Sequence, residues 1–163
     1  MTSSSQSRAE THAVAHELAE EVLRRSGRLV LPANGRSMVP AIWPGDSLVV
    51  EPATSSNVAP GDIVLFSNAH RFVAHRVVEK KGDAENWRVL TRGDAMATAD
   101  APIRLSEILG KVLFIVRNGR CFEPKKSLRR SERALATLLR CSETAARVIV
   151  GVHGLTRASI KTV

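Results

Sequence analysis

The stretch 35-GRSMVPAIWPGDSLVV-50 places a Ser and a Met between a Gly-Arg pair and a Pro, and a Pro-Gly-Asp turn follows. The packing of a hydrophobic core does not require this order of residues. Ser37 is therefore a candidate nucleophile, and the alternative is a polar loop residue that leads into a strand. The turn followed by Ser-Leu-Val-Val indicates the start of a β-strand.

Short apolar segments of the same kind recur along the chain, separated by Gly, Asn, Asp or Pro and without a fixed repeat. The expected strands are RLVLPA, SLVVEP, GDIVLF, RFVAHRVV, WRVLTRG and ILGKVLFIV, at residues 28–33, 47–52, 61–66, 71–78, 87–93 and 108–116. This pattern predicts a mainly β fold with a coiled or barrel-like core.

Helical patterns flank the predicted β core. A capping box at Ser7-Arg8-Ala9-Glu10 begins a helix over residues 8–25 that Gly27 ends, and we expect the first seven residues to be disordered. A basic linker then leads to a second amphipathic helix over residues 131–150. The expected parts are a disordered start with a helix (1–26), a β domain (27–119) and a basic helical tail (120–163).

The whole net charge of +8 lies in the tail. Residues 1–116 contain 13 basic and 13 acidic side chains, whereas residues 117–163 contain 11 basic and 3 acidic ones. A basic amphipathic helix suits an anionic membrane surface or an acidic partner, and the alternative is a helix that covers the β core with its arginines in water. With six aromatic residues in the chain, we expect no specific nucleic-acid partner.

Hydrophobic stretches long enough for membrane insertion are absent from the sequence. No segment approaches the roughly 18 consecutive apolar residues of a membrane span, and the N-terminus lacks the apolar region of a signal peptide. We therefore expect a cytoplasmic protein whose contact with a membrane is peripheral.

A serine hydroxyl needs a base within hydrogen-bonding reach to act as a nucleophile. Among the five histidines, His75 shares one face of an expected strand with two valines, and its alternative role is that of a buried structural residue. Such a base needs a carboxylate on its second ring nitrogen. The segment TRGDAMATAD offers Asp94 and Asp100, and either residue suits this role. The two cysteines lack metal-ligand spacing, and we expect neither a metal nor a cofactor.

The ordered set GRSMVPAIWPGDSLVV, PGDIVLF, AHRVV, TRGDAMATAD and LGKV resembles the signal-peptidase superfamily, which includes the self-cleaving repressors. The resemblance covers residues 27–116. It implies that Ser37 is the nucleophile and His75 the general base, where classical bacterial signal peptidases have a Lys. This is the Ser–His–Asp arrangement of the archaeal and endoplasmic-reticulum branch. By the same resemblance Asp100 is the first choice for the orienting carboxylate and Asp94 the second.

The activity that the resemblance implies is that of a serine endopeptidase. Its substrate would be an extended peptide that docks by strand addition, with a small residue before the cut, and Met38 and Ile42 are candidates to line that site. Gly35 stands where many bacterial relatives have a Ser, so the oxyanion hole is expected to use backbone N–H groups, including that of Ser37.

Two alternatives are a non-catalytic peptide-binding module on the same fold and a self-cleaving regulator. The second fits less well, because the chain has no Ala-Gly or Cys-Gly dipeptide of the kind that such regulators cleave. Its roughly 26 residues before the β core are also too few for a helix-turn-helix domain.

Overall fold

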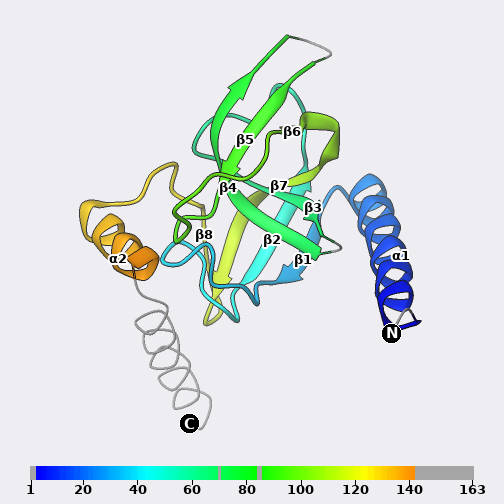
Figure 1. Ribbon diagram of the computed structural model, residues 1–163, viewed down its shortest axis with the longest axis horizontal. Coiled ribbons are helices and arrows are strands. Elements are labelled where there is room, and N and C mark those ends of the chain that lie inside the picture. Colours follow the sequence, from blue (N-terminus) through cyan, green and yellow to red (C-terminus); the bar gives the residue numbers. More distant parts are fainter. Residues whose placement is uncertain (1–2, 70, 84–85, 142–163) are drawn as a thin grey trace, which may run out of the picture.

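In the part of the chain that the structure describes, a single antiparallel sheet of eight strands forms the body, with one helix on each side (Figure 1). The computed structural model describes residues 3–69, 71–83 and 86–141. The elements in chain order are α1 (Ser3–Ser26), β1 (Leu29–Pro32), β2 (Ser47–Pro52), β3 (Ile63–Asn68), β4 (Arg71–Lys81), β5 (Arg88–Arg92), β6 (Ile103–Arg104), β7 (Ile108–Arg117), β8 (Arg120–Phe122) and α2 (Arg130–Cys141), with a 3-10 turn at Leu105–Glu107. The expected mainly β fold is confirmed.

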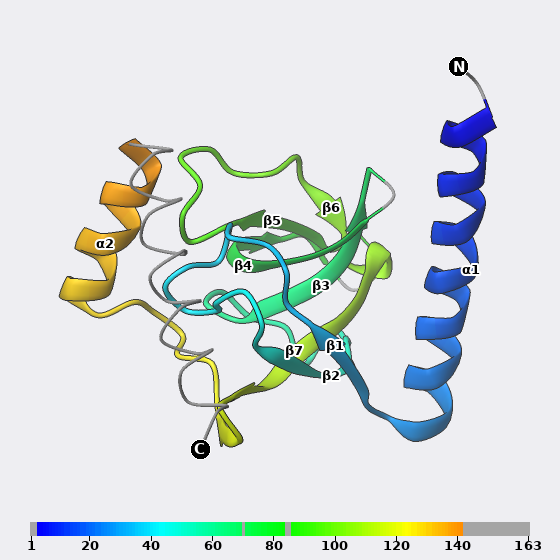
Figure 2. The same cartoon turned by 90° about the horizontal axis from the view of Figure 1, so that it is seen from below.

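The strand order is β1-β2-β7-β3-β4-β5-β6, and β8 pairs with β7. Strand β4 joins two parts of the sheet, because its first half pairs with β3 and its second half, from Arg76 onward, pairs with β5. The sheet curves strongly, as the view from below shows (Figure 2). All six expected strands are present, and the short strands β6 and β8 are additions that the sequence pattern did not indicate.

Two Pro-Gly-Asp turns start strands β2 and β3 in the same way. The Gly of each turn has a positive φ, 87° in the first and 93° in the second, which favours glycine at these positions. The carboxylate of Asp46 accepts a hydrogen bond from the N–H of Trp43, and Asp62 accepts one from the N–H of Ala59. Asp46 and Asp62 therefore stabilise turns.

The core consists of two clusters on the two sides of β3, because Ile63 and Leu65 point into one and Val64 and Phe66 into the other. The first cluster also receives Leu23 from α1. Its buried members are Leu23, Met38, Ile42, Leu48, Val50, Ile63, Leu65, Val112 and Ile115, and those of the second are Val58, Val64, Phe66, Val77, Val89 and Ile108.

Helix α1 lies beside the sheet and begins earlier than expected (Figure 2). It starts at Ser3 instead of residue 8, so the expected disorder of the first seven residues is wrong from Ser3 onward. Extending an existing helix by a turn avoids the cost of nucleation, which explains why modest helix formers join it. Gly27 follows the helix with a φ of 67°, and its N–H donates to the Leu23 carbonyl, as a helix end requires.

Helix α2 lies on the opposite side of the β body from α1 (Figure 2). It begins one residue before the expected start, and the part of that expected helix beyond Cys141 lies outside the described residues. An anionic or acidic partner for the basic tail stays a prediction. Within the described ranges, no helix combines the length and the apolar character that crossing a bilayer requires.

A buried ion pair fastens the first Pro-Gly-Asp turn to β7. Asp46 has no exposed surface, and its carboxylate accepts hydrogen bonds from Nε and Nη2 of Arg117 at distances of 2.7 to 3.2 Å. Arg117 also donates to the carbonyl of Ala41. One guanidinium thus holds both the turn and the segment that follows Ser37.

We predict that Asp46→Ala lowers the free energy of unfolding by about 3 kcal/mol, because it leaves the Arg117 guanidinium without its carboxylate in a partly buried place. Thermal and denaturant unfolding measure this change. The matched control is Glu79→Ala, which breaks an exposed pair with Lys81 and should cost less than about 1 kcal/mol. An equal loss in both variants would contradict the structural role of the buried pair.

Candidate active site

The structure brings Ser37, His75 and Asp100 into one hydrogen-bonded line. The Oγ of Ser37 lies 3.0 Å from Nε2 of His75, and Nδ1 of His75 lies 2.7 Å from Oδ2 of Asp100. Ser37 comes from the turn after β1, His75 from β4 and Asp100 from the loop after β5. A serine can be activated when one ring nitrogen of a histidine faces its hydroxyl and a carboxylate binds the other ring nitrogen, and these three side chains have that geometry.

Strand β4 fixes the imidazole of His75. Its side chain is 8% exposed, and its ring meets the ring of buried Phe66 edge-on at a centroid distance of 6.0 Å. Because β4 pairs with β3 without interruption from Arg71 to Arg76, the position of His75 along the strand is set by six consecutive pairs. The imidazole is therefore presented from a rigid surface.

Thr91 holds the carboxylate of Asp100, and the sequence analysis did not identify it. Its Oγ1 donates to Oδ2 of Asp100 at 2.7 Å, and its carbonyl accepts the Asp100 N–H at 2.8 Å. Thr91 is completely buried on the same face of β5 as Val89. A threonine on the apolar face of a predicted strand needs a buried partner, and this was the signal available in the sequence.

Asp94, the second candidate for orienting the imidazole, binds Arg76 instead. The guanidinium donates through Nε to Oδ1 at 2.8 Å and through Nη2 to Oδ2 at 2.7 Å, a bidentate pair with little exposure on either side. Nη1 of Arg76 also donates to the carbonyls of Gly61 and Lys125. Adjacent residues of β4 thus bind the two carboxylates that the sequence left open.

The loop after β5 lies directly against the Ser37 backbone. The N–H of Ala95 donates to the Ser37 carbonyl at 2.8 Å. A Cβ atom at Gly93 would lie 2.7 Å from that same carbonyl oxygen and 3.0 Å from the Ser37 Cβ. Only glycine therefore allows this close approach without a shift of Ser37.

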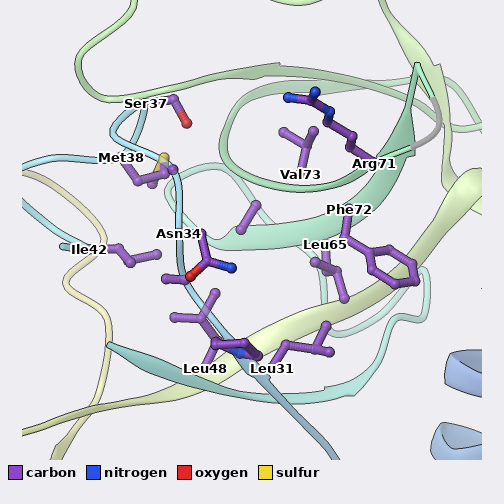
Figure 3. A pocket seen from close by; sticks show the side chains of 14 residues that line it. Leu31, Asn34, Ser37, Met38, Ile42, Leu48, Leu65, Arg71, Phe72 and Val73 are labelled. Carbon is purple, nitrogen blue, oxygen red and sulfur yellow. The ribbon is translucent and has the colours of Figure 1, made fainter. Parts of the chain in front are cut away.

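An apolar groove of about 620 Å³ extends from Ser37 between the segment that follows β1 and the start of β4 (Figure 3). Met38 and Ile42, the candidate substrate-binding residues, line it and also belong to the first core cluster. The groove is lined by Leu31, Pro32, Ala33, Asn34, Gly35, Ser37, Met38, Ile42, Leu48, Leu65, Arg71, Phe72, Val73 and Ala74.

Two strand edges border this groove. Strand β1 ends the sheet order and pairs with β2 alone among the described strands. The pairing of β4 with β5 begins at Arg76, so residues 71–75 of β4 have a strand partner on one side only within the described sheet. Unpaired N–H and C=O groups at such edges can bind an added extended chain.

Comparison with known proteins gives one family. The family model described as Peptidase S24-like matches residues 3–113, more than half of the chain. The matched span contains Ser37, His75, Asp94 and Asp100. No curated protein matches the sequence significantly.

We predict that Gly93→Ala lowers the reactivity of Ser37 with a serine-directed acylating probe by about tenfold or more, because the added methyl group displaces the Ser37 backbone from His75. Mass spectrometry of the labelled protein measures the rate. Far-UV circular dichroism should show an intact fold. Unchanged labelling by a folded variant would mean that the close approach of the loop does not set the position of Ser37.

Proposed function

The chain belongs to the Peptidase S24-like family, which is of the serine-peptidase class. On that basis we propose that it is a serine endopeptidase with Ser37 as nucleophile. The observation that carries the proposal is the hydrogen-bonded line Ser37–His75–Asp100, with distances of 3.0 and 2.7 Å. A peptide-binding module would need the groove but not this line of three groups.

The proposed reaction is acyl transfer. Nε2 of His75 accepts the Ser37 proton while Oγ attacks the peptide carbonyl carbon, and the imidazolium then protonates the departing amine. A water molecule then gives a proton to His75 and attacks the carbonyl carbon of the acyl-ester. The Ser37 Oγ leaves and takes that proton from His75, which restores the serine hydroxyl. Throughout, Asp100 accepts a hydrogen bond from Nδ1–H, which fixes the tautomer and stabilises the imidazolium. We assign the Ser37 N–H to the oxyanion hole.

The substrate that we propose is an extended peptide with a small residue before the cleaved bond. The open edge of β4 and the segment after β1 can both pair with such a chain. Buried Met38 and Ile42 leave an apolar floor near Ser37, which favours a side chain such as that of Ala. This choice rests on the superfamily resemblance and on the lining of the groove.

Within the superfamily, we propose that the chain uses the Ser–His–Asp chemistry of the archaeal and endoplasmic-reticulum branch. An imidazole has an ordinary pKa near 6.5 and serves as a base with little tuning, whereas the ammonium group of a lysine must first be desolvated. The imidazole in turn requires an orienting acceptor, and the contact of His75 with Asp100 supports that role.

We predict that Ser37→Ala and His75→Ala each reduce the cleavage of a peptide with an Ala-x-Ala site by a factor on the order of 10⁴ or more, because each removes a member of the acyl-transfer machinery. Chromatography of the products measures the rate, and Ser37→Ala should also abolish labelling by the acylating probe.

The intact mass of the chain, followed in parallel, separates cleavage of the added peptide from self-cleavage. Cleavage that persists in the Ser37→Ala variant would contradict the proposal. So would a native chain that neither cleaves nor becomes labelled, with or without lipid vesicles.

The two carboxylates should differ in their effects. We predict that Asp100→Asn lowers kcat by about 10³-fold with little change in thermal stability, because a neutral amide does not stabilise the imidazolium and its NH₂ group favours the wrong tautomer. Asp94→Asn should act mainly on stability, since it weakens a bidentate pair with Arg76. Steady-state kinetics well below each melting temperature, with calorimetry, test this. A larger kcat loss for Asp94→Asn than for Asp100→Asn would reverse the assignment.

A further inference from the structure

Arg71 is the one charged side chain among the described residues that line the groove. It is exposed, and its guanidinium is directed toward the end of the groove where Ser37 lies (Figure 3). We propose that Arg71 makes the protein select peptides with Asp or Glu at the fourth position before the cleaved bond. This inference rests on the proposed function and names a specificity-determining residue for it.

The alternation of side chains along β4 gives the position. Phe72 and Ala74 pack against the core cluster that contains Met38 and Ile42, whereas Arg71 and Val73 point to the other face of the strand. A small substrate residue that enters the site near Met38 and Ile42 therefore shares the face of Ala74. Counting back one substrate residue for each strand residue places the third residue beside Phe72 and the fourth beside Arg71.

In this register the peptide runs parallel to β4, and each of its side chains lies on the same face as the neighbouring side chain of β4, with the two strands about 4.8 Å apart. The side chain of the fourth residue is then within reach of the long arginine side chain. The groove extends from Ser37 toward Phe72 and Arg71, so it accommodates the part of the substrate that precedes the cut.

Electrostatics favours an acidic residue at this position. A guanidinium binds a carboxylate through two parallel N–H···O hydrogen bonds, and it repels a lysine. No Asp or Glu occurs among the described groove-lining residues, so no carboxylate of the groove itself competes for the guanidinium. Arg71 is exposed, so water and salt screen the pair, and the preference should weaken as ionic strength rises.

The test compares peptides with one Ala-x-Ala site that carry a single Glu, Gln or Lys at the fourth, fifth or sixth position before the cut. We expect kcat/KM of the native chain to be about tenfold higher for Glu than for Lys at the fourth position. Arg71→Glu should reverse this order, so that this variant cleaves the Lys peptide faster than the Glu peptide. The matched control is Arg120→Glu, an equal change of charge in β8, which should keep the native preference.

Binding to the Ser37→Ala chain gives a readout that does not depend on cleavage. Fluorescence anisotropy of the labelled Glu and Lys peptides should show the same preference, and Arg71→Glu in that background should reverse it. Cleavage without a Glu preference, or a preference that survives Arg71→Glu, would overturn this inference but not the proposed peptidase function.

Selective binding through Arg71 without any cleavage would overturn the proposed function alone. Binding without selectivity would overturn this inference.

Discussion

The loop from Gly93 to Asp100 is held against β4 by two neighbouring side chains, and the geometry of the whole site depends on this attachment. Arg76 binds Asp94 near the start of the loop, and His75 binds Asp100 at its end. Because successive residues of a strand point to opposite faces, the loop meets the strand on both faces. Between these two contacts, the N–H of Ala95 reaches the carbonyl of Ser37.

The two carboxylates of this loop have different partners. Asp94 faces a bidentate guanidinium that also binds the carbonyls of Gly61 and Lys125, so its charge is compensated inside a structural network. Asp100 faces an imidazole and the hydroxyl of Thr91, which leaves its charge available to an imidazolium. The second Pro-Gly-Asp turn joins the same network through a contact between Asp62 and Lys126.

Local features of the sequence predicted most of the fold. Turn residues between apolar runs placed six strands correctly. Two of these strands, β2 and β3, follow Pro-Gly-Asp turns, which have a conformational preference of their own. The motifs singled out Ser37 and His75 together through the family resemblance, and the structure places their side chains 3.0 Å apart. The residues alone left Asp94 and Asp100 open, and only the family resemblance ranked Asp100 first. Which carboxylate reaches His75 depends on which face of β4 each half of the loop reaches. The contact of Thr91 with Asp100 was missed for the same reason: it arises only when the loop folds back onto β5.

The register of β4 also explains why His75 and Arg76 can act so differently while adjacent. The pairing with β3 is continuous from Arg71 to Arg76, whereas the irregularity in the pairing with β5 begins only after Val77. A shift of β4 by one residue would turn each side chain to the other face. Arg76 would then lie against buried Phe66, where an unpaired charge is costly, and the imidazole would lie among the partners of the guanidinium. The penalty for burying that charge therefore disfavours the shifted register. The observed register directs the imidazole of His75 toward Ser37.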